Sequence, residues 1–116
     1  MIVDDDQNYL SFASVALEQL WPDAKLVSFA GSLAALEFVA LNSTDLVVTD
    51  FRMPDFDGLQ LTAAIQAIDP AVRVVVMSGQ PEAQELALAR GAHAFAAKDA
   101  LVEQLRLALQ QLGFVR

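Results

Sequence analysis

The 116-residue sequence contains no cysteine and a single histidine, His93. Without cysteine there can be no disulfide, no thiolate-ligated zinc or iron–sulfur cluster and no thiol nucleophile. One histidine also excludes a His-rich metal site. No apolar run approaches the roughly 18 residues that a membrane span needs, and no basic segment precedes an apolar one as in a signal peptide. We therefore expect a cytoplasmic protein with no membrane contact.

Basic residues are also scarce. Seven lysines and arginines stand against fifteen aspartates and glutamates, which gives a formal charge of −8. A broad contact with nucleic acid or with an anionic membrane requires the opposite sign. Because 55% of the residues are hydrophobic, the chain has enough apolar material for one core. Its length is typical of a single domain, which we expect to cover residues 1–116.

Short apolar segments alternate with helical patterns along the whole chain. Ser32 is suited to cap the second helix, and Pro81 is suited to the first position of the fourth. This (βα)5 order with short connections predicts an α/β fold with a doubly wound, parallel five-stranded sheet. The flavodoxin-like strand order 2-1-3-4-5 is the common arrangement, and it binds ligands beyond the carboxyl ends of the strands. The expected strands are Met1–Val3, Lys25–Phe29, Leu46–Thr49, Val72–Met77 and Ala94–Ala97, and the expected helices are 7–20, 32–40, 61–68, 81–91 and 101–112.

Six of the ten aspartates lie near the ends of the first and third expected strands. Asp6 and Asp57 are suited to cap the helices that follow. Asp4, Asp5 and Asp50 would meet at one edge of the sheet, where two carboxylates ~4 Å apart repel by about 4 kcal/mol at an effective dielectric of about 20. A bound cation would offset this repulsion. Oxygen ligands without nitrogen or sulfur favour Mg²⁺.

Two further polar side chains follow the fourth and fifth expected strands, namely Ser78 and Lys98. On local signal alone, a helix cap explains Ser78 and a solvated side chain explains Lys98. A metal ion, a hydroxyl and an ammonium around a carboxylate are together the groups that bind the three oxygens of a phosphoryl group. Asp50 would then be a nucleophile that forms an acyl phosphate.

Four segments of the sequence match a known family in order and spacing. They are Ile2–Asp6, Val47–Gly58, Val75–Gly79 and Gly91–Lys98. On these segments the chain resembles the receiver domains of response regulators, the phosphoacceptor modules of two-component signalling, over essentially its whole length. Asp99 stands where many receivers have a proline, and in this respect the chain resembles the receivers that are attached to helix-turn-helix outputs.

The resemblance implies a metal site and a phosphorylation site. Asp50 would be the residue that is phosphorylated. Mg²⁺ would bind Asp5, Asp50 and the backbone carbonyl of Arg52, and Asp4 would act through a metal-bound water. The protein would assist its own phosphorylation and dephosphorylation without being an enzyme.

The resemblance also implies a switch and a set of partners. Ser78 would hydrogen-bond the phosphoryl group and Lys98 would pair with it. Phe95 falls at the aromatic switch position, where it would act through packing because it has no hydroxyl. The implied partners are a sensor histidine kinase, an output domain or effector protein on the surface of the fourth helix, fifth strand and fifth helix, and a second copy in a phosphorylation-dependent homodimer. The implied output is control of transcription.

Two other functions stay open. A receiver-like interaction domain would need no phosphorylation, although the full set of acidic, hydroxyl and lysine positions favours a working phosphoacceptor. An aspartyl-nucleophile phosphatase or phosphotransferase would need a further acid/base residue and a cap over its substrate. No Gly-rich loop with Lys-Ser or Lys-Thr is present, which excludes a P-loop enzyme. No basic helix-turn-helix follows Arg116, so we expect no DNA binding by this chain, and we interpret His93 as a surface residue.

Overall fold

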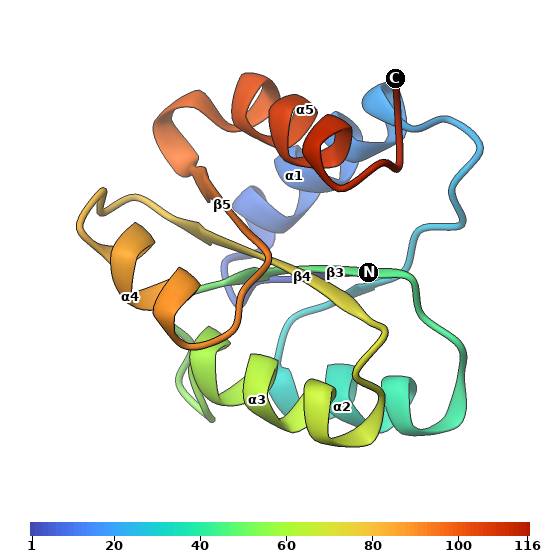
Figure 1. The fold of residues 1–116 in the computed structure, drawn as a ribbon, viewed down its shortest axis with the longest axis vertical. Helices are drawn as coiled ribbons and strands as arrows, with labels where there is room; N and C mark the ends of the chain where they lie inside the picture. The colour runs from blue at the N-terminus through green and yellow to red at the C-terminus, as the bar shows by residue number, and fades with distance from the viewer.

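The computed structural model describes residues 1–116 as a parallel five-stranded sheet between two layers of helices (Figure 1). The strand order is β2-β1-β3-β4-β5, which confirms the predicted fold class. None of the helices has the length and apolar character that crossing a lipid bilayer requires. The strands are β1 (Ile2–Val3), β2 (Ser28–Phe29), β3 (Leu46–Asp50), β4 (Arg73–Ser78) and β5 (Ala94–Ala97). The helices are α1 (Gln7–Leu20), α2 (Ser32–Leu41), α3 (Gly58–Ile68), α4 (Ala83–Ala89) and α5 (Leu101–Gln111), and a 3₁₀ turn, η1, covers Lys98–Ala100.

The sheet separates two apolar clusters because successive side chains of a strand face opposite sides. Val48 and Val75 belong to the cluster under α1 and α5. Val47 and Val74 belong to the cluster against α2, α3 and α4. Figure 1 shows the same division, with α1 and α5 on one side of the sheet and the other three helices on the opposite side. β3 and β4 are apolar on both faces for this reason, as is typical of central parallel strands.

The register of the strands determines which side chains meet at the carboxyl edge of the sheet. β1 and β3 are aligned so that Asp4, the residue after β1, comes beside Asp50, the last residue of β3. On the other side of β3, Asp50 is opposite the residue before Ser78. Ser78 is in turn opposite the residue before Lys98. Four polar residues from distant parts of the sequence are therefore placed along one edge.

The start of α2 differs from the sequence prediction. Ser32 is the first helical residue and not the cap, and its hydroxyl donates to the carbonyl oxygen of Phe56 at 2.6 Å. The cap comes from Asp55, whose carboxylate accepts hydrogen bonds from the amides of Ser32 at 2.9 Å and Leu33 at 3.1 Å. A cap that lies 23 positions away in the chain leaves no local signal.

Other boundaries also differ. β2 covers Ser28–Phe29 only, because this edge strand pairs with β1 through two residues. α3 begins earlier than expected, at Gly58, and α4 begins later, at Ala83. The predicted caps at Asp6 and Asp57 are confirmed, since each carboxylate accepts hydrogen bonds from two amides in the first turn of its helix.

Candidate functional site

Three aspartates converge beyond the carboxyl ends of β1 and β3. One carboxylate oxygen from each of Asp4, Asp5 and Asp50 lies within 4.8 Å of the other two. Asp4 is fully buried and Asp50 is 9% exposed, whereas Asp5 faces the solvent. Hard oxygen ligands on one side and open solvent on the other suit Mg²⁺, because this ion uses few carboxylates and keeps several waters.

Lys98 lies between two of these carboxylates. Its Nζ atom is 2.9 Å from Oδ2 of Asp4 and 3.0 Å from Oδ1 of Asp50. Desolvation lowers the pKa of Lys98, but the hydrogen bonds and charges of Asp4 and Asp50 raise it above its usual value. Three carboxylates and one ammonium leave a formal charge of −2 at this site. One divalent cation would balance that charge.

The carboxylate of Asp50 is ionised in an unfavourable environment. Burial raises its pKa, Asp4 raises it further, and hydrogen bonds from Lys98 and from the amide of Phe51, the latter at 3.0 Å, partly oppose this rise. A carboxylate that solvent stabilises poorly binds an electrophile or a cation more strongly than a fully hydrated one. Burial and the contact with Lys98 thus act in opposite directions on the pKa of Asp50.

Of the other residues expected at the site, Ser78 ends β4, Arg52 follows β3 and Phe95 lies in β5. The hydroxyl oxygen of Ser78 accepts a hydrogen bond from the amide of Gln80 at 3.0 Å, which leaves the hydroxyl proton free to donate to a ligand. Arg52 is exposed, and its guanidinium carbon lies 5.5 Å from the centre of the Phe51 ring. Phe95 is half-buried in β5 and packs on the cluster that faces α2, α3 and α4.

The connection between β5 and α5 begins at Lys98. Lys98 to Ala100 form the 3₁₀ turn η1, and the Lys98–Asp99 peptide is trans. Asp99 therefore follows a trans peptide bond. The turn carries the carbonyl of Lys98 toward α1 while the side chain returns to the aspartates.

Tyr9 also contacts the site through Lys98, although no motif in the sequence indicates this contact. Its hydroxyl donates to the carbonyl oxygen of Lys98 at 3.0 Å, and the Nζ atom of Lys98 lies 4.1 Å from the centre of its ring. Burial raises the pKa of Tyr9, and the charges of Asp4, Asp50 and Asp99 raise it further. The phenol is therefore neutral at the site. Its position in α1 is an ordinary half-buried helix position, so no motif or spacing indicates a role for it.

His93 lies apart from the site, as expected, but it is more than a surface residue. It is half-buried, and its Nδ1 atom accepts a hydrogen bond from the amide of Val74 at 3.0 Å. Burial lowers the pKa of His93, and the charge of Arg73 lowers it further. The neutral imidazole therefore completes the hydrogen bonding where the pairing of β4 and β5 begins.

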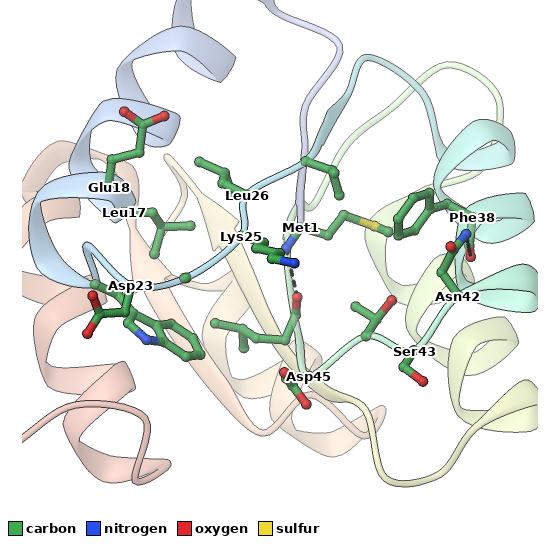
Figure 2. A pocket seen from close by; sticks show the side chains of 15 residues that line it. Met1, Leu17, Glu18, Asp23, Lys25, Leu26, Phe38, Asn42, Ser43 and Asp45 are labelled. Carbon is green, nitrogen blue, oxygen red and sulfur yellow. Dashed lines mark hydrogen bonds between the residues drawn. The ribbon is translucent and has the colours of Figure 1, made fainter.

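A cavity of about 550 Å³ opens at the other end of the sheet, where β1 and β3 begin (Figure 2). Figure 2 shows the amino group of Met1 in this cavity, where it donates to the carbonyl oxygen of Leu46 at 2.9 Å. Lys25 is the one lysine of the lining. None of the aspartates at the carboxyl edge belongs to the cavity, so it is separate from the site at Asp50.

Comparisons with known proteins agree with this geometry. The family model for the response regulator receiver domain matches residues 1–110. The chain is 32% identical over 121 residues to the C4-dicarboxylate transport transcriptional regulatory protein DctD of Rhizobium meliloti, with 98% of this chain covered. It is 38% identical over 93 residues to protein-glutamate methylesterase/protein-glutamine glutaminase 5 of Myxococcus xanthus, with 77% of this chain covered. The chain spans about a quarter of each relative's length, 26% in both cases.

A solved structure shows the same fold. The signal receiver domain of NarL from Mycobacterium tuberculosis superimposes with a TM-score of 0.82 at 28% identity. The superposition covers 99% of this chain and 94% of the NarL chain. The likeness thus extends over the whole sheet and all the helices around it.

Proposed function

The chain belongs to the family of response regulator receiver domains, and from this premise we propose that Asp50 accepts a phosphoryl group from a phosphohistidine of a sensor kinase. Receiver domains are the phosphoacceptor parts of two-component signalling proteins and are generally not catalysts. The observation that carries the proposal is the convergence of Asp4, Asp5 and Asp50 within 4.8 Å, with Lys98 bonded to the first and last of them.

The proposed step is a displacement at phosphorus. A carboxylate oxygen of Asp50 forms a new bond to phosphorus while the phosphorus–nitrogen bond of phosphohistidine breaks, and the bonding pair leaves on the imidazole nitrogen. The product is an acyl phosphate on Asp50. The ammonium of Lys98 would shift its hydrogen bond from the Asp50 oxygen to a phosphoryl oxygen. The hydroxyl of Ser78 would donate its free proton in a hydrogen bond to another phosphoryl oxygen. Positioning and charge stabilisation of this kind supply most of the catalysis in phosphoryl transfer.

Receiver domains bind Mg²⁺ in an acidic pocket, and the donors in this chain fit that ion. We propose that Asp5, Asp50 and the backbone carbonyl of Arg52 hold it, and that Asp4 acts through a bound water. When bound, Mg²⁺ neutralises charge on the acceptor and on the phosphoryl oxygens. The formal charge of −2 left by the three carboxylates and Lys98 supports a divalent ion.

We propose that phosphorylation alters the surface formed by α4, β5 and α5. As the hydroxyl of Ser78 is drawn toward the phosphoryl group, Phe95 would turn further inward. Apolar side chains on α4 and α5 are exposed and available to an output domain, an effector or a second copy. They are Leu86, Leu88, Val102 and Leu107.

The output that we propose is control of transcription, in the cytoplasm. The named function of DctD, a transcriptional regulatory protein, supports this output. The methylesterase relative shows that receivers of similar sequence also occur in proteins with an enzymatic activity. Of the two, the transcriptional relative aligns with 98% of this chain against 77% for the methylesterase.

Intact-mass spectrometry after incubation with acetyl phosphate tests the proposal. We expect one phosphoryl group per chain with Mg²⁺, none with a chelator, and none in Asp50→Asn. The matched control is Asp23→Asn, an exposed aspartate away from the site, which should be phosphorylated like the wild type. Continuous release of phosphate from unrelated phosphate esters would favour a phosphatase. No incorporation from acetyl phosphate or phosphoramidate would favour an interaction domain.

A further inference from the structure

Tyr9 contacts both ends of Lys98. The hydroxyl bonds the backbone carbonyl at 3.0 Å across 89 positions of sequence, and the ring face lies 4.1 Å from the ammonium nitrogen. Tyr9 belongs to the first turn of α1, and Lys98 begins η1. One side chain therefore joins α1 to the connection between β5 and α5, and it does so through the residue that bridges the two buried aspartates.

We propose that Tyr9 is a positioning residue, which holds the ammonium of Lys98 between Asp4 and Asp50 and thereby speeds the capture of a phosphoryl group by Asp50. This inference rests on the proposed function, since it names a further residue of the same site. Tyr9 touches neither carboxylate by hydrogen bond, so its effect passes through Lys98.

The physical reason is the freedom of a lysine side chain. The four rotatable bonds of a lysine side chain give it a large rotamer entropy, which opposes holding its ammonium at one point. Two N–H groups can be directed to Asp4 and Asp50, at 2.9 and 3.0 Å. The electron-rich face of Tyr9 also attracts the cation, whose nitrogen lies 4.1 Å from the ring centre. The hydroxyl of Tyr9, by its hydrogen bond to the carbonyl oxygen of Lys98, holds the backbone from which the lysine side chain extends.

Tyr9 itself is held in place by its neighbours. Its ring packs against the cluster under α1 and α5, and it meets the ring of Phe12 in a tilted arrangement with centroids 5.7 Å apart. A supported ring loses little freedom when it contacts a cation. The contact with Lys98 is therefore pre-formed before a phosphodonor arrives.

Two substitutions separate the ring from the hydroxyl. Tyr9→Phe keeps the ring under the ammonium and removes only the bond to the Lys98 carbonyl, whereas Tyr9→Leu removes both contacts. We expect phosphorylation by acetyl phosphate to slow by less than about twofold in Tyr9→Phe. In Tyr9→Leu we expect it to slow by about fivefold, the factor that corresponds to ~1 kcal/mol of cation–π attraction.

The contact can be observed directly because the chain has two lysines, Lys25 and Lys98. In protein labelled with ¹³C-lysine, the ε-CH₂ protons of Lys98 should resonate upfield of those of Lys25, owing to the ring current of Tyr9. The upfield shift should persist in Tyr9→Phe and disappear in Tyr9→Leu, while the Lys25 signal stays in place. This measurement needs no phosphorylation.

A double-mutant cycle separates positioning from general support of the fold. In a Lys98→Ala background, Tyr9→Leu should slow phosphorylation no further. Equal slowing in both backgrounds, or a Lys98 signal that is the same in the wild type and Tyr9→Leu, would overturn the inference and leave the proposed function intact. A wild-type protein that takes up no phosphoryl group would overturn both.

Discussion

A Cβ atom on Gly58 would lie 2.2 Å from the carbonyl oxygen of Asp50, well inside any non-bonded contact. The amide of Gly58 also donates to the carbonyl oxygen of Phe51 at 2.7 Å. The first residue of α3 is thus packed directly on the backbone of the proposed phosphoacceptor. The φ of Gly58 is not in the left-handed region, so its backbone conformation does not require glycine. The close approach to Asp50 does.

We expect Gly58→Ala to destabilise the protein by about 1–3 kcal/mol, because a methyl group can be accommodated only by shifting the backbone. Urea denaturation gives the free energy of unfolding. Gly79→Ala is the matched control, since a Cβ there meets no atom within 4 Å and φ is not positive. Equal stabilities of the two variants would contradict the close packing of Gly58 on Asp50.

Asp50 should reduce the stability of the folded protein. Burial raises its pKa above the ordinary 3.8, so the ionised form is less favourable in the folded state than in the unfolded state. The cost is present at pH values above the raised pKa and disappears below 3.8, where both states are protonated. We expect Asp50→Asn to raise the urea midpoint at pH 7 without divalent cations. This gain in the urea midpoint should shrink as the pH falls. A lower midpoint for Asp50→Asn than for the wild type at pH 7 would contradict the claim that the ionised Asp50 destabilises the folded state.

Mg²⁺ should stabilise the folded state because it binds the three aspartates only when they are brought together. At 100 times its dissociation constant, one bound ion adds about 2.7 kcal/mol to the free energy of unfolding. We expect the melting temperature to rise in the wild type and much less in Asp5→Asn. Asp6→Asn is the control, since Asn also caps a helix well and Asp6 is outside the cluster. A rise in Asp5→Asn as large as in this control would contradict the metal site.

Asp55 joins the loop after β3 to the start of α2. Slight desolvation raises its pKa, but hydrogen bonds from Phe56, Leu33 and Ser32 lower it below the ordinary 3.8. We expect Asp55→Ala to cost about 1 kcal/mol at neutral pH, the usual effect of losing an N-cap. The part of this cost that depends on the carboxylate charge should be complete above pH 3.8 and be lost as the pH falls through the lowered pKa. Asp55→Asn keeps an acceptor oxygen, so its free energy of unfolding, measured by urea denaturation, should lie between those of the wild type and Asp55→Ala.

The fold class could be predicted from the sequence because the central strands are buried on both faces and are therefore largely apolar. The runs at β3 and β4 are of this kind, and with short connections they leave one common topology. The same argument predicted that Asp4 and Asp50 would meet, since parallel strands end at one edge. Caps formed by the next residues, at Asp6 and Asp57, were predicted correctly because they depend on local sequence.

Contacts between distant residues could not be predicted in this way. The cap of α2 by Asp55 and the contact of Tyr9 with Lys98 join segments that are 23 and 89 positions apart. Each depends on how a loop or turn is placed after folding, and no local spacing indicates either partner. The sequence predicts a phosphoryl group as the partner of Lys98, whereas its salt bridges to Asp4 and Asp50 depend on where the turn after β5 places the side chain.

The most direct test of the site locates the phosphoryl group itself. After incubation with acetyl phosphate and Mg²⁺, borohydride reduces an aspartyl phosphate to homoserine, which peptide mass spectrometry identifies by position. We expect homoserine at position 50 and at no other aspartate. Homoserine at position 4 or 5, or its formation in equal amount without Mg²⁺, would contradict a magnesium-assisted phosphoacceptor at Asp50.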